Sequence, residues 1–123
     1  MIARPLDGQR VLVVEDEFLV ALDMTQMIEE RGGTVIGPAG NFDRAMALAR
    51  SQMIDGAILD VNLDKRDSFP VADTLLARGI PVVFATGYDG LLLPERFVDT
   101  PKLTKPFTEA AVERTLTRAF GHH

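Results

Sequence analysis

Four groups of polar side chains stand directly after apolar segments of this 123-residue sequence. They are Glu15 with Asp16, then Asp60, Thr86 and Lys105. One such residue has a simple structural explanation, since an aspartate often caps a loop and a lysine usually lies at the surface. To explain all of them in this way would require several unrelated roles that happen to fall at successive strand ends. The pattern therefore indicates one site assembled from residues that are distant in the sequence.

The chemistry of this site follows from the charges of its side chains. The carboxylates of Glu15, Asp16 and Asp60 would repel one another strongly at close range unless a cation joined them. Oxygen ligands favour a hard divalent ion, and Mg²⁺ suits a site that keeps some water molecules. We expect Asp16 and Asp60 to bind Mg²⁺ directly, with Glu15 close by or bonded through water. A metal ion, a lysine and a hydroxyl group beside one carboxylate suit an incoming phosphoryl group.

Asp60 is the residue that we expect to react. As a nucleophile it would attack phosphorus and form an aspartyl phosphate. Thr86 would bind one phosphoryl oxygen through its hydroxyl group, and Lys105 would bind another through its charge. These roles define a phosphoacceptor.

Two other classes of protein fit parts of this pattern. A phosphatase of the haloacid dehalogenase type would also use a strand-end aspartate with Mg²⁺. It would need a second aspartate two residues later, where this sequence has Asn62. A flavodoxin would need a phosphate-binding loop after its first strand, and the acidic run at 15–17 would repel a phosphate there. The pattern therefore favours a phosphoacceptor over both.

The elements that would position these residues alternate between strands and helices. Continuous apolar segments predict buried strands at 10–14, 34–36, 56–60, 81–85 and 102–104. Helical spacing of apolar residues, with caps at Asn41 and Thr108, predicts helices over 18–31, 41–52, 70–78 and 108–120. Residues 37–40 and 64–67 are expected to be loops, and 91–98 to hold at most a short helix. The alternation predicts an α/β, flavodoxin-like (βα)5 fold, a three-layer sandwich with parallel sheet order 2-1-3-4-5. In such a sheet the functional crevice lies outside the carboxyl ends of the strands.

Composition indicates one globular domain over residues 1–123, with no output domain after the last helix. The absence of cysteine excludes disulfides and thiolate metal sites. No apolar run approaches the roughly 20 residues of a membrane span. The first residues also lack the apolar region of a signal peptide, so we expect a cytoplasmic protein that contacts no membrane. The net charge of −5, without a long basic run, disfavours nucleic acid as a partner.

Four short motifs surround the candidate residues: Val-Val-Glu-Asp-Glu at 13–17, Ile-Leu-Asp-Val-Asn-Leu at 58–63, Ala-Thr-Gly at 85–87 and Lys-Pro-Phe at 105–107. In their order and spacing they resemble the motifs of CheY-like response-regulator receiver domains. The resemblance implies that Asp60 accepts a phosphoryl group from a phosphohistidine on a histidine kinase or a histidine phosphotransfer protein. It implies Mg²⁺ binding by Asp16, Asp60 and the backbone carbonyl of Asn62, and a cis peptide bond between Lys105 and Pro106. Such a domain would be a phosphoacceptor rather than an enzyme, and it would signal through protein contacts as a monomer or weak homodimer.

The sequence also departs from the usual receiver pattern. Glu15 replaces one of the two aspartates that receivers usually carry at the first acidic position. Lys102 stands where receivers usually have an aromatic residue that rotates inward, so we expect another readout, in which Thr86 moves toward the phosphoryl group and residues 89–100 reorganise. Phe-Ala-Thr-Gly-Tyr at 84–88 resembles a subgroup of receivers often associated with HWE-type histidine kinases of alphaproteobacteria. Tyr88 would either slow the attack of water on the acyl phosphate or be an ordinary loop aromatic. A stand-alone receiver and a receiver segment of a hybrid histidine kinase both remain open.

Overall fold

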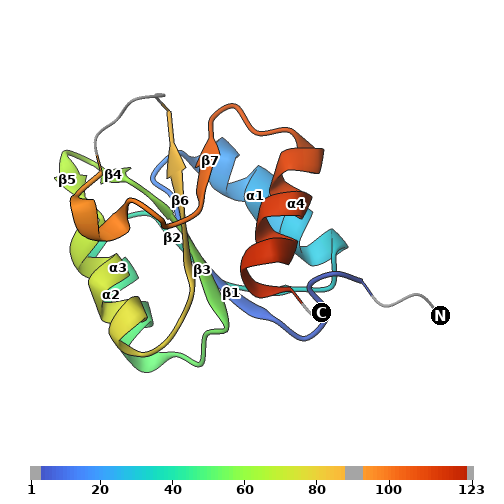
Figure 1. The fold of residues 1–123 in the computed structure, drawn as a ribbon, viewed down its shortest axis with the longest axis horizontal. Coiled ribbons are helices and arrows are strands. Elements are labelled where there is room, and N and C mark those ends of the chain that lie inside the picture. Colours follow the sequence, from blue (N-terminus) through green and yellow to red (C-terminus); the bar gives the residue numbers. More distant parts are fainter. Residues whose placement is uncertain (1–3, 88–92, 122–123) are drawn as a thin grey trace.

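Five parallel strands form the centre of the molecule (Figure 1). The computed structural model describes residues 4–87 and 93–121. The strands are β1 (Arg10–Val14), β2 (Thr34–Ala39), β3 (Gly56–Asp60), β6 (Val82–Thr86) and β7 (Lys102–Thr104). They pair in the order β2-β1-β3-β6-β7, and every pair in this sheet is parallel. Counted within this sheet alone, the order is 2-1-3-4-5, so the predicted flavodoxin-like arrangement is confirmed.

Four α-helices cover the two faces of the sheet. α1 (Phe18–Glu30) and α4 (Glu109–Phe120) lie on one side, and α2 (Phe42–Ser51) and α3 (Phe69–Ala77) lie on the other (Figure 1). The predicted caps are present, because the side chain of Asn41 accepts the Arg44 N–H and that of Thr108 accepts the Ala111 N–H. No helix within the described residues is both long enough and apolar enough to cross a membrane.

The core consists of two apolar layers, one on each face of the sheet. Successive side chains of a strand point to opposite faces. Leu12 and Val14 of β1 therefore pack with α2 and α3, whereas Val11 and Val13 pack with α1 and α4. This explains why the central strands are continuous apolar runs, and why a polar side chain can first occur where a strand ends.

The second strand is longer than the sequence predicted. Residues 37–40 were expected to be a loop, but β2 continues to Ala39, which pairs with Val14 after a register shift. Gly37 adopts φ 95°, and the peptide bond from Gly37 to Pro38 is cis, as is the expected one from Lys105 to Pro106. The irregular backbone at Gly37 allows the pairing to resume at Ala39, whose carbonyl accepts the Glu15 N–H.

A small antiparallel hairpin replaces the polar loop that was expected after β3. Its strands are β4 (Asn62–Leu63) and β5 (Arg66–Asp67). The two turn residues, Asp64 and Lys65, both have positive φ values of 44° and 71°. Such turns strongly prefer glycine at the second position, and the lysine there explains why the hairpin was not predicted. The buried side chain of Leu63 anchors it to the core.

The segment before β7 holds one short 3-10 helix, η1 (Glu95–Phe97), within the region where a short helix was considered. Residues 91 and 92 of that region lie outside the described residues. Phe97 is buried and its ring contacts those of Phe84 and Phe69. Arg96 pairs with Asp73 of α3 through two hydrogen bonds of 3.0 Å. The described part of this segment is therefore attached to both β6 and α3.

A substitution at Gly56 would test how closely α4 packs against the sheet. A Cβ atom added at Gly56 would lie 2.5 Å from the ring of Phe120. We expect Gly56→Ala to lower the free energy of unfolding by about 1 to 3 kcal/mol, measured by urea denaturation, because neither β3 nor the ring can move freely. In a Phe120→Ala background most of this cost should disappear. Gly40→Ala is the control, since a Cβ there has its nearest neighbour at 3.9 Å. An equal cost in both backgrounds would contradict this packing.

Candidate functional site

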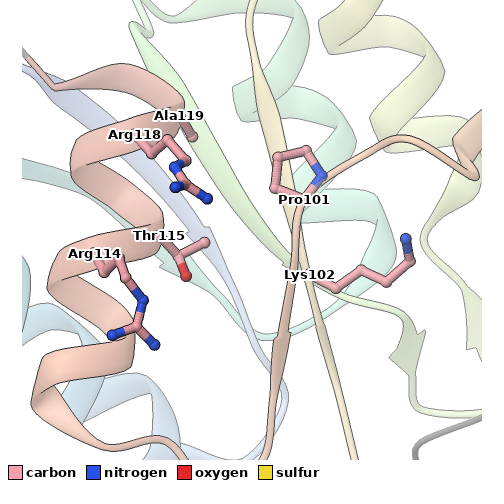
Figure 2. Close-up of a pocket in the computed structure, with 6 residues that line it drawn as sticks. All are labelled: Pro101, Lys102, Arg114, Thr115, Arg118 and Ala119. Atoms are coloured by element: carbon pink, nitrogen blue, oxygen red, sulfur yellow. The ribbon is translucent and has the colours of Figure 1, made fainter.

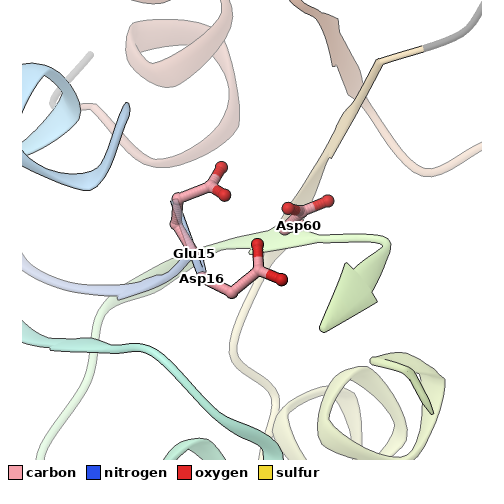
Figure 3. A group of neighbouring side chains, drawn as sticks. All are labelled: Glu15, Asp16 and Asp60. Atoms are coloured by element: carbon pink, nitrogen blue, oxygen red, sulfur yellow. The ribbon is translucent and has the colours of Figure 1, made fainter. Parts of the chain in front are cut away.

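Three carboxylates meet at the carboxyl ends of β1 and β3. Figure 3 shows the side chains of Glu15, Asp16 and Asp60 extending into the same space. One oxygen of each lies within 4.8 Å of an oxygen of the others. Glu15 and Asp60 are buried, whereas Asp16 is exposed. The site is therefore closed toward the core and open on the side of Asp16.

The Lys105 ammonium group lies against these carboxylates. Its Nζ atom is 2.7 Å from Glu15 Oε1, 3.1 Å from Asp60 Oδ2 and 3.5 Å from Glu17 Oε1. The backbone places it there, because the Lys105 N–H donates to the Thr86 carbonyl at the end of the β6–β7 pair. Residues 15–17, Asp60 and Lys105 are distant in the sequence, and they thus meet around the Lys105 ammonium group.

Each carboxylate also accepts one backbone hydrogen bond. Asp60 Oδ1 accepts the Asn62 N–H at 3.2 Å, and Asp16 Oδ2 accepts the Asp64 N–H at 3.0 Å. Glu15 Oε2 accepts the N–H of Glu17 at 3.1 Å. Two of these three donors belong to the β4–β5 hairpin and its turn. The hairpin therefore holds the carboxylates of Asp60, at the end of β3, and of Asp16 in place.

Thr86 and Asn62 complete the set of predicted residues. Thr86 is the buried last residue of β6, one position beyond Ala85, which pairs with Asp60. Asn62 begins β4, two residues after Asp60, with its side chain exposed. The structure brings both to the same end of the sheet as the carboxylates. Tyr88 lies outside the described residues.

Burial controls the ionisation of this cluster. Burial raises the pKa of Glu15 from 4.5 to about 7, against the opposing hydrogen bond from Lys105. Burial alone would lower the pKa of Lys105, but its hydrogen bonds and charge interactions with Glu15 and Asp60 raise it above the usual value. Lys105 is therefore a permanent cation at neutral pH, while Glu15 can gain or lose a proton there.

Glu17 and a groove beside Lys105 were among the features of the site that were not predicted from the sequence. Glu17 was treated only as part of an acidic run, yet its carboxylate lies beside Lys105. A groove of about 370 Å³ also opens next to Lys105, between α1 and the loop before α4. Its lining includes Val20, Asp23 and Phe107. Only the position of Phe107 directly after Lys105-Pro106 could have indicated that an apolar wall stands there.

The sequence of this chain matches a known protein family. A profile of the response regulator receiver domain matches residues 11–116. The chain belongs to this family.

The receiver domain is similar to several regulators of known sequence or structure. It is 35% identical over 104 residues to the transcriptional regulatory protein PdtaR of Mycobacterium tuberculosis. The aligned region covers 81% of this chain and 51% of PdtaR. It is 34% identical over 118 residues to the phyllosphere-induced regulator PhyR of Methylorubrum extorquens, covering 89% of this chain and 42% of PhyR. The chain thus spans about half the length of these curated relatives or less.

Solved structures agree with the fold. The solution structure of SdrG from Sphingomonas melonis Fr1 matches with a TM-score of 0.80 at 42% identity, over 94% of this chain and 96% of SdrG. The crystal structure of PhyR from Brucella abortus matches with a TM-score of 0.80 at 30% identity, over 96% of this chain and 49% of that one. The receiver fold is therefore shown both by sequence and by structure.

Glu15 should make the stability of the metal-free receiver depend on pH. Its pKa of about 7 in the folded state exceeds the ordinary 4.5, so the folded state binds the proton more tightly. The stability gained in this way is fully present below about pH 4.5 and is lost as pH rises through about 7. We expect the free energy of unfolding of the wild type, relative to Glu15→Gln, to fall by up to about 3 kcal/mol between pH 5 and 8. Denaturation in EDTA at several pH values measures this. Parallel pH profiles for the two proteins would contradict the assignment.

Proposed function

We propose that this receiver accepts a phosphoryl group on Asp60 from a phosphohistidine of a histidine kinase or a histidine phosphotransfer protein. The observation that carries the proposal is the position of the Asp60 carboxylate. It ends a central strand, 3.1 Å from the Lys105 ammonium group and within 4.8 Å of two further carboxylates. A buried nucleophile beside a fixed cation and a cluster of oxygen ligands suits transfer of a phosphoryl group.

The transfer itself is a single displacement at phosphorus. A carboxylate oxygen of Asp60 forms the new P–O bond as the P–N bond to the donor imidazole breaks. The electron pair of the broken bond stays on the imidazole nitrogen, and the donor leaves as neutral imidazole because its other ring nitrogen carries the proton. Lys105 and Thr86 each bind an oxygen of the transferred group, Lys105 by charge and Thr86 through its hydroxyl group.

The acidic cluster fits Mg²⁺ as the cofactor of this transfer. Its donors are all oxygens, and its exposed side leaves room for water ligands and a phosphoryl oxygen. Asp16 and Asp60 would bind the ion directly, with the Asn62 carbonyl as a further ligand and Glu15 nearby. When bound, Mg²⁺ would neutralise charge that builds up on the phosphoryl oxygens. The hydrogen bond from the Asp64 N–H to Asp16 supports the proposal, because it orients this ligand before the ion arrives.

The contacts of this chain fit a conformational response to phosphorylation that passes through the segment before β7. We propose that Thr86 moves toward the phosphoryl group, as expected from the sequence, and that the described residues 93–100 respond. Phe84, two residues before Thr86, contacts the buried ring of Phe97 in that segment. Lys102 supports an alternative to aromatic rotation, because its Nζ is held outside the core by the carbonyls of Val98 and Thr100.

An apolar patch beside the site supports a protein as the donor. Phe18 and Leu19 begin α1 directly after Glu17 and are 76% and 72% exposed. Leu22, one turn further along α1, is also exposed. Large apolar side chains that remain exposed next to a reactive site commonly mark a surface covered by a partner. We propose that a helix of the phosphodonor protein covers this patch, and HWE-type kinases are the donors that the sequence motif favours.

Asp60→Asn tests the proposed phosphoacceptor. The variant should incorporate no phosphoryl group from acetyl phosphate with Mg²⁺, because an amide oxygen is a far weaker nucleophile than a carboxylate. The measurement is intact mass after incubation, with the wild type gaining one phosphoryl group. Asp64→Asn is the matched control, since Asp64 is an exposed aspartate four residues away whose turn conformation asparagine tolerates. Wild-type incorporation by Asp60→Asn would overturn the assignment.

Variants of Phe18 and Leu19 test docking of the protein donor separately from phosphoryl transfer to Asp60. Replacing both with serine should lower kcat/KM for transfer from a phosphorylated histidine kinase about tenfold or more, because an apolar contact at the interface is lost. The rate with acetyl phosphate should stay unchanged, since this small donor needs no docking surface. Met53→Ser is the control, an equally exposed apolar residue (76%) outside this patch. A parallel loss with both donors would show that the double variant damages the site rather than docking.

A further inference from the structure

Arg66 of the β4–β5 hairpin lies over the first residue of α2. The central carbon of its guanidinium group is 3.6 Å from the centre of the Phe42 ring, a distance at which a cation and an aromatic face attract each other. Its Nη1 atom is also 4.0 Å from Asp43 Oδ1, but the Asp43 side chain is 96% exposed, and an ion pair at such a site contributes little. The ring contact is therefore the stronger of these two attachments.

Phe42 offers Arg66 a fixed surface. It is the first residue of α2 and follows the N-cap Asn41, whose side chain accepts the Arg44 N–H at 2.8 Å. The side chain of Phe42 is partly buried and packs against the core on the side of the sheet that α2 and α3 cover. Because both the cap and the core hold α2, a hairpin residue that stacks on Phe42 is held relative to the sheet as well.

The hairpin needs such contacts, because it is too small to be stable alone. Each of its strands has two residues, and even longer two-stranded hairpins are marginal in water. The turn residues Asp64 and Lys65 both adopt positive φ values, a region that residues other than glycine rarely populate. The buried side chain of Leu63 attaches the hairpin to the core. Arg66, which pairs with Leu63 across the hairpin, attaches it to α2.

The same hairpin carries backbone groups that orient the carboxylates of the acidic site. The Asn62 N–H donates to Asp60 Oδ1, and the Asp64 N–H donates to Asp16 Oδ2. The Asn62 carbonyl is itself one of the proposed Mg²⁺ ligands. Only a closed hairpin therefore presents the full set of ligands in place. The fraction of molecules with a closed hairpin would then set the apparent affinity for the ion.

We propose that Arg66 is a positioning residue of the metal site, which keeps the hairpin closed by stacking on Phe42. This role rests on the Mg²⁺ site of the proposed function, and it adds a residue that touches neither the ion nor the phosphoryl group. By its charge alone, Arg66 would have the opposite effect, because one cation repels another. Removal of Arg66 should tighten Mg²⁺ binding if only its charge matters, and weaken it if its stacking matters.

Calorimetric titration of Mg²⁺ into the full chain, without phosphorylation, separates the two effects. Arg66→Ala should raise the Kd for Mg²⁺ about two- to fivefold, the factor by which an exposed cation–π contact shifts an equilibrium. Lys65→Gln is the matched control, since it removes a charge from the same hairpin but leaves the contact with Phe42, and it should not raise the Kd. Arg118→Ala removes an arginine from α4, on the opposite face of the sheet from α2, and should change nothing (Figure 2).

Phe42→Leu tests the same contact from the side of α2. It should raise the Kd by a similar factor, and the double variant with Arg66→Ala should bind Mg²⁺ no more weakly than either single variant, because both remove one interaction. A second measurement needs no metal. Exchange of the Asp64 amide hydrogen, followed by NMR in EDTA, should be about two- to fivefold faster in Arg66→Ala, since the hairpin opens more often, while the amides of β1 and β3 keep their wild-type rates.

Unchanged or tighter Mg²⁺ binding by Arg66→Ala would overturn the positioning role. Equal weakening by Lys65→Gln, or additive losses in the double variant, would overturn it as well. A wild type that binds no Mg²⁺ would overturn the proposed metal site and this role with it. Because none of these measurements involves phosphoryl transfer, they leave the test of Asp60 as the phosphoacceptor separate.

Discussion

The contact between one lysine and two buried carboxylates is the interaction on which this domain depends. Glu15 and Asp60 are almost inaccessible to water, and burying either charge without a partner would be costly. Lys105 approaches both, at 2.7 Å and 3.1 Å. The ends of β1 and β3 and the loop after β7 must therefore stay in register. Removing one member of such a buried group typically costs about 3 to 5 kcal/mol.

This constraint explains why the charged residues of the site lie at the ends of the strands. The central strands are apolar on both faces, so the charged residues of the site are confined to the strand ends, where we propose that Asp60 accepts the phosphoryl group. Lys105 does not balance the cluster fully, because its one ammonium group faces the carboxylates of Glu15, Asp60 and Glu17, and Asp16 lies beside Glu15 and Asp60. The remaining negative charge is what a divalent cation would neutralise.

Sequence reasoning predicted most of the fold because its strongest signals are long. Continuous apolar strands and capped helices determined the order of the sheet, and that order placed Glu15, Asp60 and Lys105 at one edge. The β4–β5 hairpin was missed, because Asp64 and Lys65 form a turn that usually contains glycine. The direct pairing of Lys105 with Glu15 was also missed, since Lys105 was assigned only to a phosphoryl oxygen and side-chain partners depend on exact backbone positions.

The most direct test of this account is the thermal unfolding of Lys105→Met at pH 8, with EDTA and then with saturating Mg²⁺. If Lys105 is the cation that compensates the buried carboxylates, the variant should melt roughly 10 °C below the wild type in EDTA. Mg²⁺ should recover more than half of this loss, because a second cation at the same carboxylates replaces the missing charge. The account would be contradicted if the variant had the same melting temperature as the wild type in EDTA. It would also be contradicted if Mg²⁺ raised the melting temperature of the variant no more than that of the wild type.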